Sequence, residues 1–231
     1  MPEEPQTSPV GKKFELSPSI SILAAGALIA GAIVFVNLNP SQPVVTVGDP
    51  VVEADVSLPN TNDYVRGSPG ASIVLVEYSD FQCPYCAMIH PTLKRIVEES
   101  NGEIAWVYRH LPLESIHPQA LPAALASECI GEQLGQNGFW AFADDVFVDQ
   151  SGMSSARYAS LAQELGADAA QFNACVASKK YLSKIDAAAL EAQSNGGTGT
   201  PFTVVIAGDT QKTISGALPY AQIMAVINSL R

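Results

Sequence analysis

The chain has 231 residues, 47% of them hydrophobic, which is enough for one domain with a substantial core. Its formal net charge of −11 at pH 7 provides no basic surface to neutralise phosphates, which speaks against nucleic-acid binding. There are only four cysteines and three histidines, so each can be weighed individually.

The strongest feature near the start is the apolar run Ile20–Leu38, which contains no charged residue. As a helix it would span roughly 28 Å, close to the thickness of the hydrocarbon core of a membrane. Lys12 and Lys13 precede it, so the positive-inside rule places residues 1–19 in the cytoplasm as a short tail. A cleaved signal peptide is the alternative, but the run exceeds the usual ~7–15 apolar residues and Val36–Pro40 is a poor cleavage site. We therefore predict a single-pass membrane anchor, with the rest of the chain periplasmic or extracellular.

Residues 39–70 are rich in Pro, Gly, Asn and Asp, and they show no sustained periodicity. We interpret them as an extended linker outside the membrane. From residue 71 the pattern changes. The run Ile73–Val76 is typical of a strand covered on both faces, and helix-spaced apolar residues from Ile89 to Val97 follow it. Ile104–Tyr108 predicts a second strand, which completes a βαβ unit with parallel strands.

The stretch 117–194 is rich in Ala, Leu and Gln and predicts several helices. Two further strands, Phe202–Ile206 and Gln211–Ser215, are separated by a Gly-Asp turn, and a final helix begins near Tyr220. We therefore predict one α/β domain over 71–231, in which βαβ and ββα halves enclose a helical insertion at 117–194.

Cys83-x-x-Cys86 lies where the first strand ends and its helix begins. Zinc would need four ligands, and His90 is the sole extra candidate nearby. A c-type haem would need His directly after the second cysteine, where the chain has Ala87. Neither a metal nor an organic cofactor is therefore expected.

A redox-active dithiol fits this position on physical grounds. The free N–H groups and positive dipole end of a helix start favour a thiolate, and Pro84 is tolerated there because its missing N–H has no helical partner. We expect Cys83 to be the more exposed and more acidic sulfur, and hence the nucleophile. Cys86, one turn into the helix, should be buried and resolve the mixed disulfide.

Several segments of the chain form a recognisable combination with the cysteine pair. They are Glu77–Cys86, Pro91, Val107–Pro112, His117–Pro118, Phe139–Trp140, Gly199–Phe202 and Ser215–Pro219. Together they resemble the DsbA-like branch of the thioredoxin superfamily. The resemblance covers about Tyr64 to Arg231 and implies a thioredoxin fold with a helical insertion.

The resemblance also implies roles for particular residues. The Thr200–Pro201 peptide should be cis and lie against the sulfurs, where the Thr200 backbone can pair with an extended substrate. Glu77 should lie beneath the cysteines and move protons to or from the buried thiol, although a solvent-reaching or Lys-paired Glu77 is the alternative. Pro84 and Tyr85 should contact substrate. Tyr85 is neutral at pH 7, which indicates a milder oxidant than relatives with His at this position.

Cys129 and Cys175 both fall in the insertion. In a cytosolic protein they would be buried apolar residues, but in an exported domain an even cysteine count favours a structural disulfide between them. Asp80 is expected near the surface as a turn or cap residue. None of the histidines is assigned to catalysis.

Taken together, the sequence predicts a membrane-tethered thiol-disulfide oxidoreductase with a monomeric catalytic domain. It would introduce disulfides into folding exported proteins through Cys83 and Cys86, and a membrane redox partner would reset the pair. A reductase or isomerase using the same pair is the alternative, and a binding or chaperone module with a merely structural disulfide is a third possibility.

Overall fold

A computed structural model describes residues 54–231. The predicted cytoplasmic tail, the anchor Ile20–Leu38 and the first part of the linker lie outside the described residues. Within 54–231, no helix combines the length and apolar character that a membrane crossing requires.

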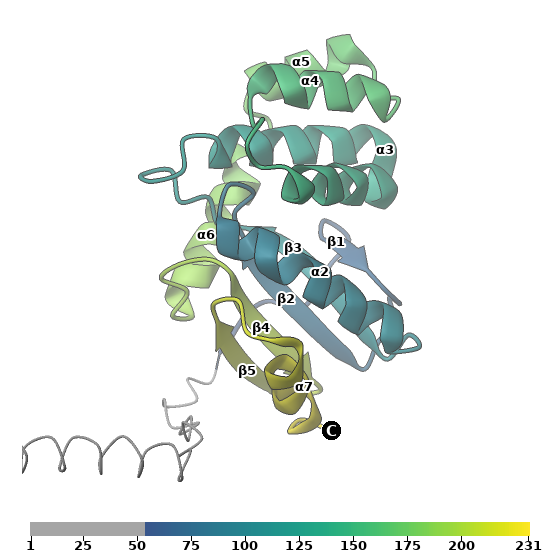
Figure 1. Ribbon diagram of the computed structural model, residues 1–231, viewed down its shortest axis with the longest axis vertical. Helices are drawn as coiled ribbons and strands as arrows, with labels where there is room; N and C mark the ends of the chain where they lie inside the picture. Colours follow the sequence, from purple (N-terminus) through teal and green to yellow (C-terminus); the bar gives the residue numbers. More distant parts are fainter. Residues whose placement is uncertain (1–53) are drawn as a thin grey trace, which may run out of the picture. The chain divides into compact units, whose positions relative to one another are not determined.

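A five-stranded mixed sheet forms the centre of the domain, in the order β1-β3-β2-β4-β5 (Figure 1). β2 and β3 are parallel and every other neighbouring pair is antiparallel. The apolar, β-branched runs expected as strands form the three inner ones, each of which is almost wholly buried. The strands are β1 (Tyr64–Arg66), β2 (Ile73–Ser79), β3 (Ile104–His110), β4 (Phe202–Ala207) and β5 (Thr210–Ser215).

Helices cover both faces of this sheet. α2 (Pro84–Glu99) and α7 (Tyr220–Asn228) pack on one face, and α6 (Leu182–Ser194) packs on the other. The connections β2–α2–β3 and β4–β5–α7 are the predicted βαβ and ββα halves of a thioredoxin-like α/β fold. Pro91 lies inside α2, as the resemblance implied.

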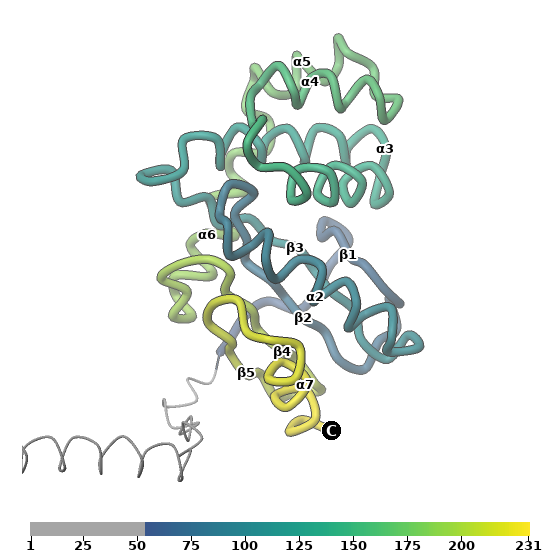
Figure 2. Tube along the Cα trace, viewed as in Figure 1, coloured from purple at the N-terminus to yellow at the C-terminus, as the bar shows by residue number. Residues whose placement is uncertain are grey.

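The helical insertion is present between β3 and β4, and Figure 2 follows the chain through it. It contains α3 (Ala120–Val148), α4 (Ser155–Glu164), α5 (Ala169–Ala177) and α6. α3 is interrupted at Gly135, whose φ of 65° is readily adopted only by glycine. Cys129 in α3 and Cys175 in α5 form the expected disulfide, with a Cα–Cα distance of 5.9 Å that is ordinary for such a bond.

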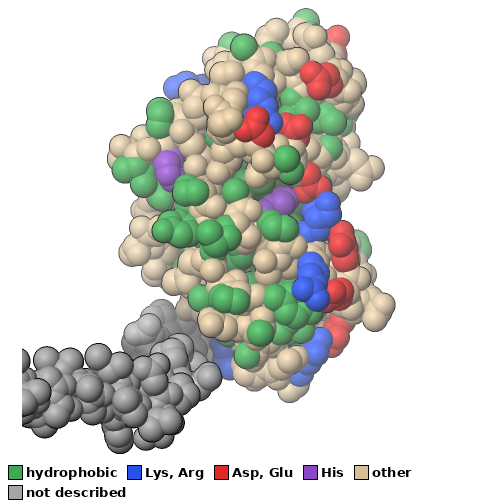
Figure 3. All heavy atoms as spheres, viewed as in Figure 1, with side chains coloured by type: hydrophobic (Ala, Val, Ile, Leu, Met, Phe, Trp, Pro, Cys, Tyr) green, Lys and Arg blue, Asp and Glu red, His purple; other side chains and the backbone are tan. Residues whose placement is uncertain are grey.

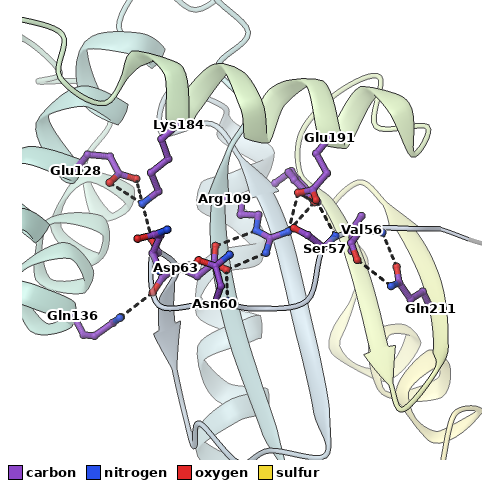
Figure 4. A network of polar contacts seen from close by, with 12 residues as sticks. Val56, Ser57, Asn60, Asp63, Arg109, Glu128, Gln136, Lys184, Glu191 and Gln211 are labelled. Carbon is purple, nitrogen blue, oxygen red and sulfur yellow. Dashed lines mark hydrogen bonds and ion pairs between the residues drawn. The ribbon is translucent and has the colours of Figure 1, made fainter.

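The segment expected to be linker joins the fold well before residue 71. Val56 is buried, and β1 pairs with β3 at the edge of the sheet. The backbone N–H groups of 55–57 are bound by side chains of distant elements rather than by a strand, as Figure 4 shows in part. These acceptors are Asn195, Gln211 and Glu191. The Pro- and Asn-rich composition gave no sign of this, because the partners lie more than 130 residues away in sequence.

A buried ionic network also fastens this segment to the sheet (Figure 4). Arg109 in β3 holds Asp63 through two hydrogen bonds of 3.0 Å and Glu191 through one of 2.8 Å. Arg109 and Asp63 are nearly inaccessible to solvent, so the loss of either partner would leave a buried charge uncompensated.

Candidate active site

The cysteine pair lies where β2 gives way to α2, as predicted. Cys83 is the N-cap residue of α2, with extended backbone angles, and Pro84 is the first helical residue. The sulfur of Cys83 therefore faces the unpaired N–H groups of the first helical turn. Both cysteines are free thiols in the structure.

The Thr200–Pro201 peptide is cis, as the resemblance implied. It directly precedes β4, and the Cys83 sulfur lies 3.4 Å from the Thr200 carbonyl oxygen. The tertiary fold thus brings together two segments that are 117 residues apart in the chain.

Hydrogen bonding lowers the pKa of Cys83 from its ordinary value to about 5. The largest contribution comes from the neighbouring Cys86 thiol, and smaller ones come from Thr200 and from the backbone N–H groups of Tyr85 and Cys86. Burial acts in the opposite direction but is outweighed. Cys83 is therefore largely a thiolate at neutral pH, which is the reactive form in disulfide exchange.

Cys83 is the more exposed of the two cysteines, as expected, but only 3% of the residue is accessible. The Thr200–Pro201 loop covers its sulfur on one side, and Gln150 donates a hydrogen bond of 3.0 Å to its backbone carbonyl from beyond the end of α3. The two residues that follow, Pro84 and Tyr85, are exposed, so Cys83 lies just beneath the surface. The predicted order still holds, because Cys86 is completely buried.

The pKa of Cys86 is shifted in the opposite direction to that of Cys83. Burial raises its pKa well above the ordinary value, and hydrogen bonding with Cys83 and the nearby Glu77 charge add to the effect. Its sulfur accepts a hydrogen bond of 3.5 Å from the backbone N–H of Asp80. The two cysteines are thus a thiolate near the surface and a protonated thiol behind it.

Glu77 lies on the face of β2 that strand alternation predicts, and it is 1% exposed. Burial raises its pKa to about 7, while hydrogen bonds from Ser79 and Trp106 partly oppose the shift. The Trp106 indole N–H donates to the carboxylate at 3.0 Å. Glu77 does not reach solvent and pairs with no lysine of residues 54–231, and it can hold or release a proton near pH 7.

Asp80 is buried rather than close to the surface, contrary to expectation. It does cap the turn, since its carboxylate accepts from the backbone N–H of Gln82 at 2.7 Å. It also accepts from the backbone N–H of Leu113 and from His117, at 2.9 and 2.7 Å. Asp80 therefore fastens the active-site turn to the segment after β3, a long-range role that no local motif indicates.

The other two histidines contact carboxylates of α3. His90 lies 2.7 Å from an Asp144 oxygen and His110 lies 3.2 Å from a Glu128 oxygen. Over residues 54–231, no cluster of three or more His, Cys, Asp or Glu side chains is arranged to hold a metal.

Comparison with known proteins agrees with this geometry. A family model described as thioredoxin matches residues 59–229. The chain belongs to the thioredoxin family. Among curated relatives, it is 30% identical over 196 residues to Na(+)/H(+) antiporter NhaA 1 of Salinispora arenicola and 33% identical over 145 residues to that of Mycolicibacterium gilvum. These matches cover 81% and 62% of this chain but only 29% and 23% of the antiporters, so they concern one portion of those proteins.

Solved structures place this thioredoxin-family member among DsbA-like proteins. Pseudomonas aeruginosa DsbA2 matches with a TM-score of 0.62 and 27% identity, over 76% of this chain and 97% of that one. Oxidised BdbD from Bacillus subtilis matches with a TM-score of 0.66 and 18% identity, over 78% and 98%. Wolbachia pipientis alpha-DsbA1 matches with a TM-score of 0.61 and 23% identity, over 75% and 92%. This is the fold of DsbA-like thiol-disulfide oxidoreductases, and it supports protein disulfide exchange.

The surface beside the cysteines of this DsbA-like domain is apolar. Tyr85 and Met88 on the first two turns of α2 are exposed, as is Val148 at the end of α3. Figure 3 shows hydrophobic side chains over the middle of this face, with charged side chains along one edge and over the upper part. Exposed apolar side chains around a reactive sulfur suit contact with unfolded polypeptide.

Proposed function

We propose that this chain introduces disulfides into exported proteins through the Cys83–Cys86 pair. The low pKa of Cys83, at the start of α2 and beside cis-Pro201, is the observation that carries the proposal. A thiolate that the fold stabilises favours the reduced form of the pair, and this makes the corresponding disulfide an oxidant.

The exchange begins with the oxidised pair and a substrate dithiol. A substrate thiolate attacks the Cys83 sulfur, the Cys83–Cys86 bond breaks, and Cys86 takes the electron pair and then a proton. A second substrate thiolate attacks the substrate sulfur of the mixed disulfide and releases Cys83 as a thiolate. The substrate has then lost two electrons to the cysteine pair, and no metal or organic cofactor takes part.

Four other residues have supporting roles in this proposal. The Thr200 backbone beside cis-Pro201 would pair with an extended substrate segment, and the exposed Pro84 and Tyr85 would contact it. Glu77 would supply and remove the proton of Cys86, since its pKa of about 7 lets it do both at neutral pH.

The proposed setting is the outer side of a membrane, with Ile20–Leu38 as a single-pass anchor and the N-terminus in the cytoplasm. The catalytic domain would act as a monomer on folding exported proteins. A membrane redox partner would accept the two electrons and restore the disulfide, and the tether would keep that partner at high effective concentration.

The direction of electron flow is tested by equilibrating the full chain, in detergent because of the predicted anchor, against glutathione buffers. A reduction potential of about −120 to −150 mV would support the oxidase. A potential of about −270 mV would indicate a reductase. The neutral Tyr85 between the cysteines is the feature that favours this second candidate, because it stabilises the thiolate less than His would. If Cys83 is alkylated no faster than free cysteine at pH 6, both exchange functions are refuted.

A further inference from the structure

Gln150 binds the turn that carries Cys83. It lies two residues beyond the end of α3, in the connection to α4. Its side-chain amide nitrogen donates to two backbone carbonyls, that of Phe81 at 2.8 Å and that of Cys83 at 3.0 Å. Both partners can only accept, so the two amide hydrogens are used and the orientation of the amide is fixed. One side chain of the helical insertion thus joins both ends of the Phe81–Cys83 turn.

The Cys83 carbonyl that Gln150 binds is also the first acceptor of α2. Cys83 is the N-cap residue, and its carbonyl accepts from the backbone N–H groups of Cys86 and Ala87 at 3.1 and 3.2 Å. A third donor, from Gln150, holds the peptide plane that follows Cys83. Since the Phe81 carbonyl is held as well, the backbone on both sides of Cys83 is restrained. This sets the direction of the Cys83 sulfur toward the free N–H groups of the first helical turn.

The connection that presents Gln150 is itself fastened to the helices beside it. Arg157 of α4 donates to the Asp145 carbonyl at 3.3 Å and to the Asp145 carboxylate at 2.6 Å, and it also binds the Asp149 carbonyl. The Asp149 carboxylate accepts from the backbone N–H of Ser151 at 3.0 Å. The residues on both sides of Gln150 are therefore held, so its side chain reaches the Cys83 turn from a fixed backbone.

Gln150 can act on Cys83 without taking part in bond making. Among residues 54–231, it is the only side chain hydrogen-bonded to the backbone of either reactive cysteine. Its amide does not titrate, so it cannot supply or remove a proton during exchange. The hydrogen bonds of the two sulfurs within the described residues go to the backbone of Asp80 and Thr200 rather than to Gln150. Its contribution must therefore act through the geometry of the helix start.

We propose that Gln150 is a positioning residue for thiol-disulfide exchange, because its amide holds the Phe81–Cys83 turn with the sulfur toward the free N–H groups of α2. The inference rests on the proposed exchange function and gives the helical insertion a part in it. Without the two hydrogen bonds the turn can move, and the sulfur spends less time against those N–H groups. The thiolate is then less stable, so Cys83 becomes less reactive at low pH and the disulfide becomes a weaker oxidant.

The full chain in detergent tests this inference with two substitutions. Gln150→Met keeps the approximate size of the side chain but removes both donors, and Gln150→Glu puts an acceptor against the two carbonyls. The reduced proteins are alkylated with iodoacetamide from pH 4 to 9. In the unmodified chain the rate should be half-maximal near pH 5, because the pKa of Cys83 is lowered to about 5. Gln150→Met should move this midpoint to about pH 6, which is a loss of about fivefold in rate at pH 5. Gln150→Glu should move it further.

The reduction potential provides a second measurement. In glutathione buffers at pH 7, Gln150→Met should lower the equilibrium constant for oxidation of glutathione by about tenfold, which is about 30 mV in potential. Gln136→Met is the matched control. Gln136 lies in α3 and also donates to a backbone carbonyl, that of Asp63 just before β1, at 2.9 Å. Its substitution should change neither the alkylation midpoint nor the potential.

A Gln150→Met profile and potential that coincide with those of the unmodified chain would overturn the positioning role. Equal shifts in Gln136→Met would also overturn it, because they would indicate a general loosening of the domain. A smaller shift in Gln150→Glu than in Gln150→Met would contradict it as well. The exchange function would survive each of these results. If the unmodified chain is alkylated no faster than free cysteine at pH 6, the exchange function fails instead.

Discussion

Cys83 and Cys86 lie one helical turn apart at the start of α2, whereas Cys129 and Cys175 come from two helices of the insertion and are 46 residues apart in sequence. The first pair consists of free thiols, with a thiolate stabilised by hydrogen bonds next to a cis-proline. The second pair is bonded across α3 and α5 and has no helix start to stabilise a thiolate. The same side chain is reactive or structural according to the backbone groups around it, so the two pairs should respond differently to the same substitution.

The largest difference should appear when each pair loses a sulfur. Cys83→Ser should abolish exchange, because no other thiol of the domain combines a low pKa with a position beside cis-Pro201. The measurement is oxidation of a reduced two-cysteine peptide by the oxidised chain. If the variant exchanges within about tenfold of the unmodified rate, the activity belongs to another group. Cys83 and Cys86 would then not be the reactive pair.

The structural pair should affect stability instead. The double variant Cys129→Ser with Cys175→Ser should lose about 4 kcal/mol of unfolding free energy, because the unfolded chain regains the freedom of a long loop. Denaturant unfolding measures this loss. Cys83 should keep its reactivity toward iodoacetamide at pH 6, and a marked fall in that reactivity would show that the two pairs are coupled.

Glu77→Gln should make the protein more stable and less active. Burial raises the pKa of Glu77 to about 7, so the stability this group contributes is fully present below its ordinary pKa of 4.5 and is lost as pH rises to about 7. At pH 8 the variant should therefore gain about 3 kcal/mol relative to the unmodified chain, and the gain should vanish near pH 4. Peptide oxidation at pH 7 should fall at least about tenfold.

Glu103→Gln, on the surface at the end of the sheet, provides the control for Glu77 because its carboxylate is about half exposed. It should change neither the stability profile nor the exchange rate. A Glu77→Gln variant that exchanges at the normal rate across the pH range would contradict the proton-handling role.

The smallest effect should come from the exposed residue between the reactive cysteines. Tyr85→His places a partly charged imidazole beside Cys83 and should lower its pKa further, which would raise the reduction potential by about 30 mV. Tyr85→Phe, which adds no charge, should leave the potential unchanged. The potential is measured in glutathione buffers at pH 7, and a fall in the Tyr85→His variant would contradict the electrostatic account of this pair.

Local sequence patterns predicted most of the fold. β2, β3, β4 and β5 lie within a few residues of the expected strands, because buried runs of β-branched residues have few other ways to satisfy their backbone and side chains. The edge strand β1 and the packed segment from residue 54 were missed. β1 pairs with β3, and the segment from residue 54 is bound by side chains of Glu191, Asn195 and Gln211. No local periodicity encodes contacts over such separations.

The site was predicted unevenly for the same reason. The Cys83-x-x-Cys86 spacing and the alternation that turns Glu77 inward are local properties. The 3% exposure of Cys83 and the burial of Asp80 depend on several chain segments meeting at one point.

The sequence by itself determined the order of strands and helices, the helix start that carries the sulfurs and the family to which the domain belongs, because each depends on residues close together in the chain. Only the tertiary structure decided how deeply Cys83 is covered and how the segment from residue 54 is held. Both depend on groups that the chain brings together from more than 100 residues away, and those contacts exist only once it has folded.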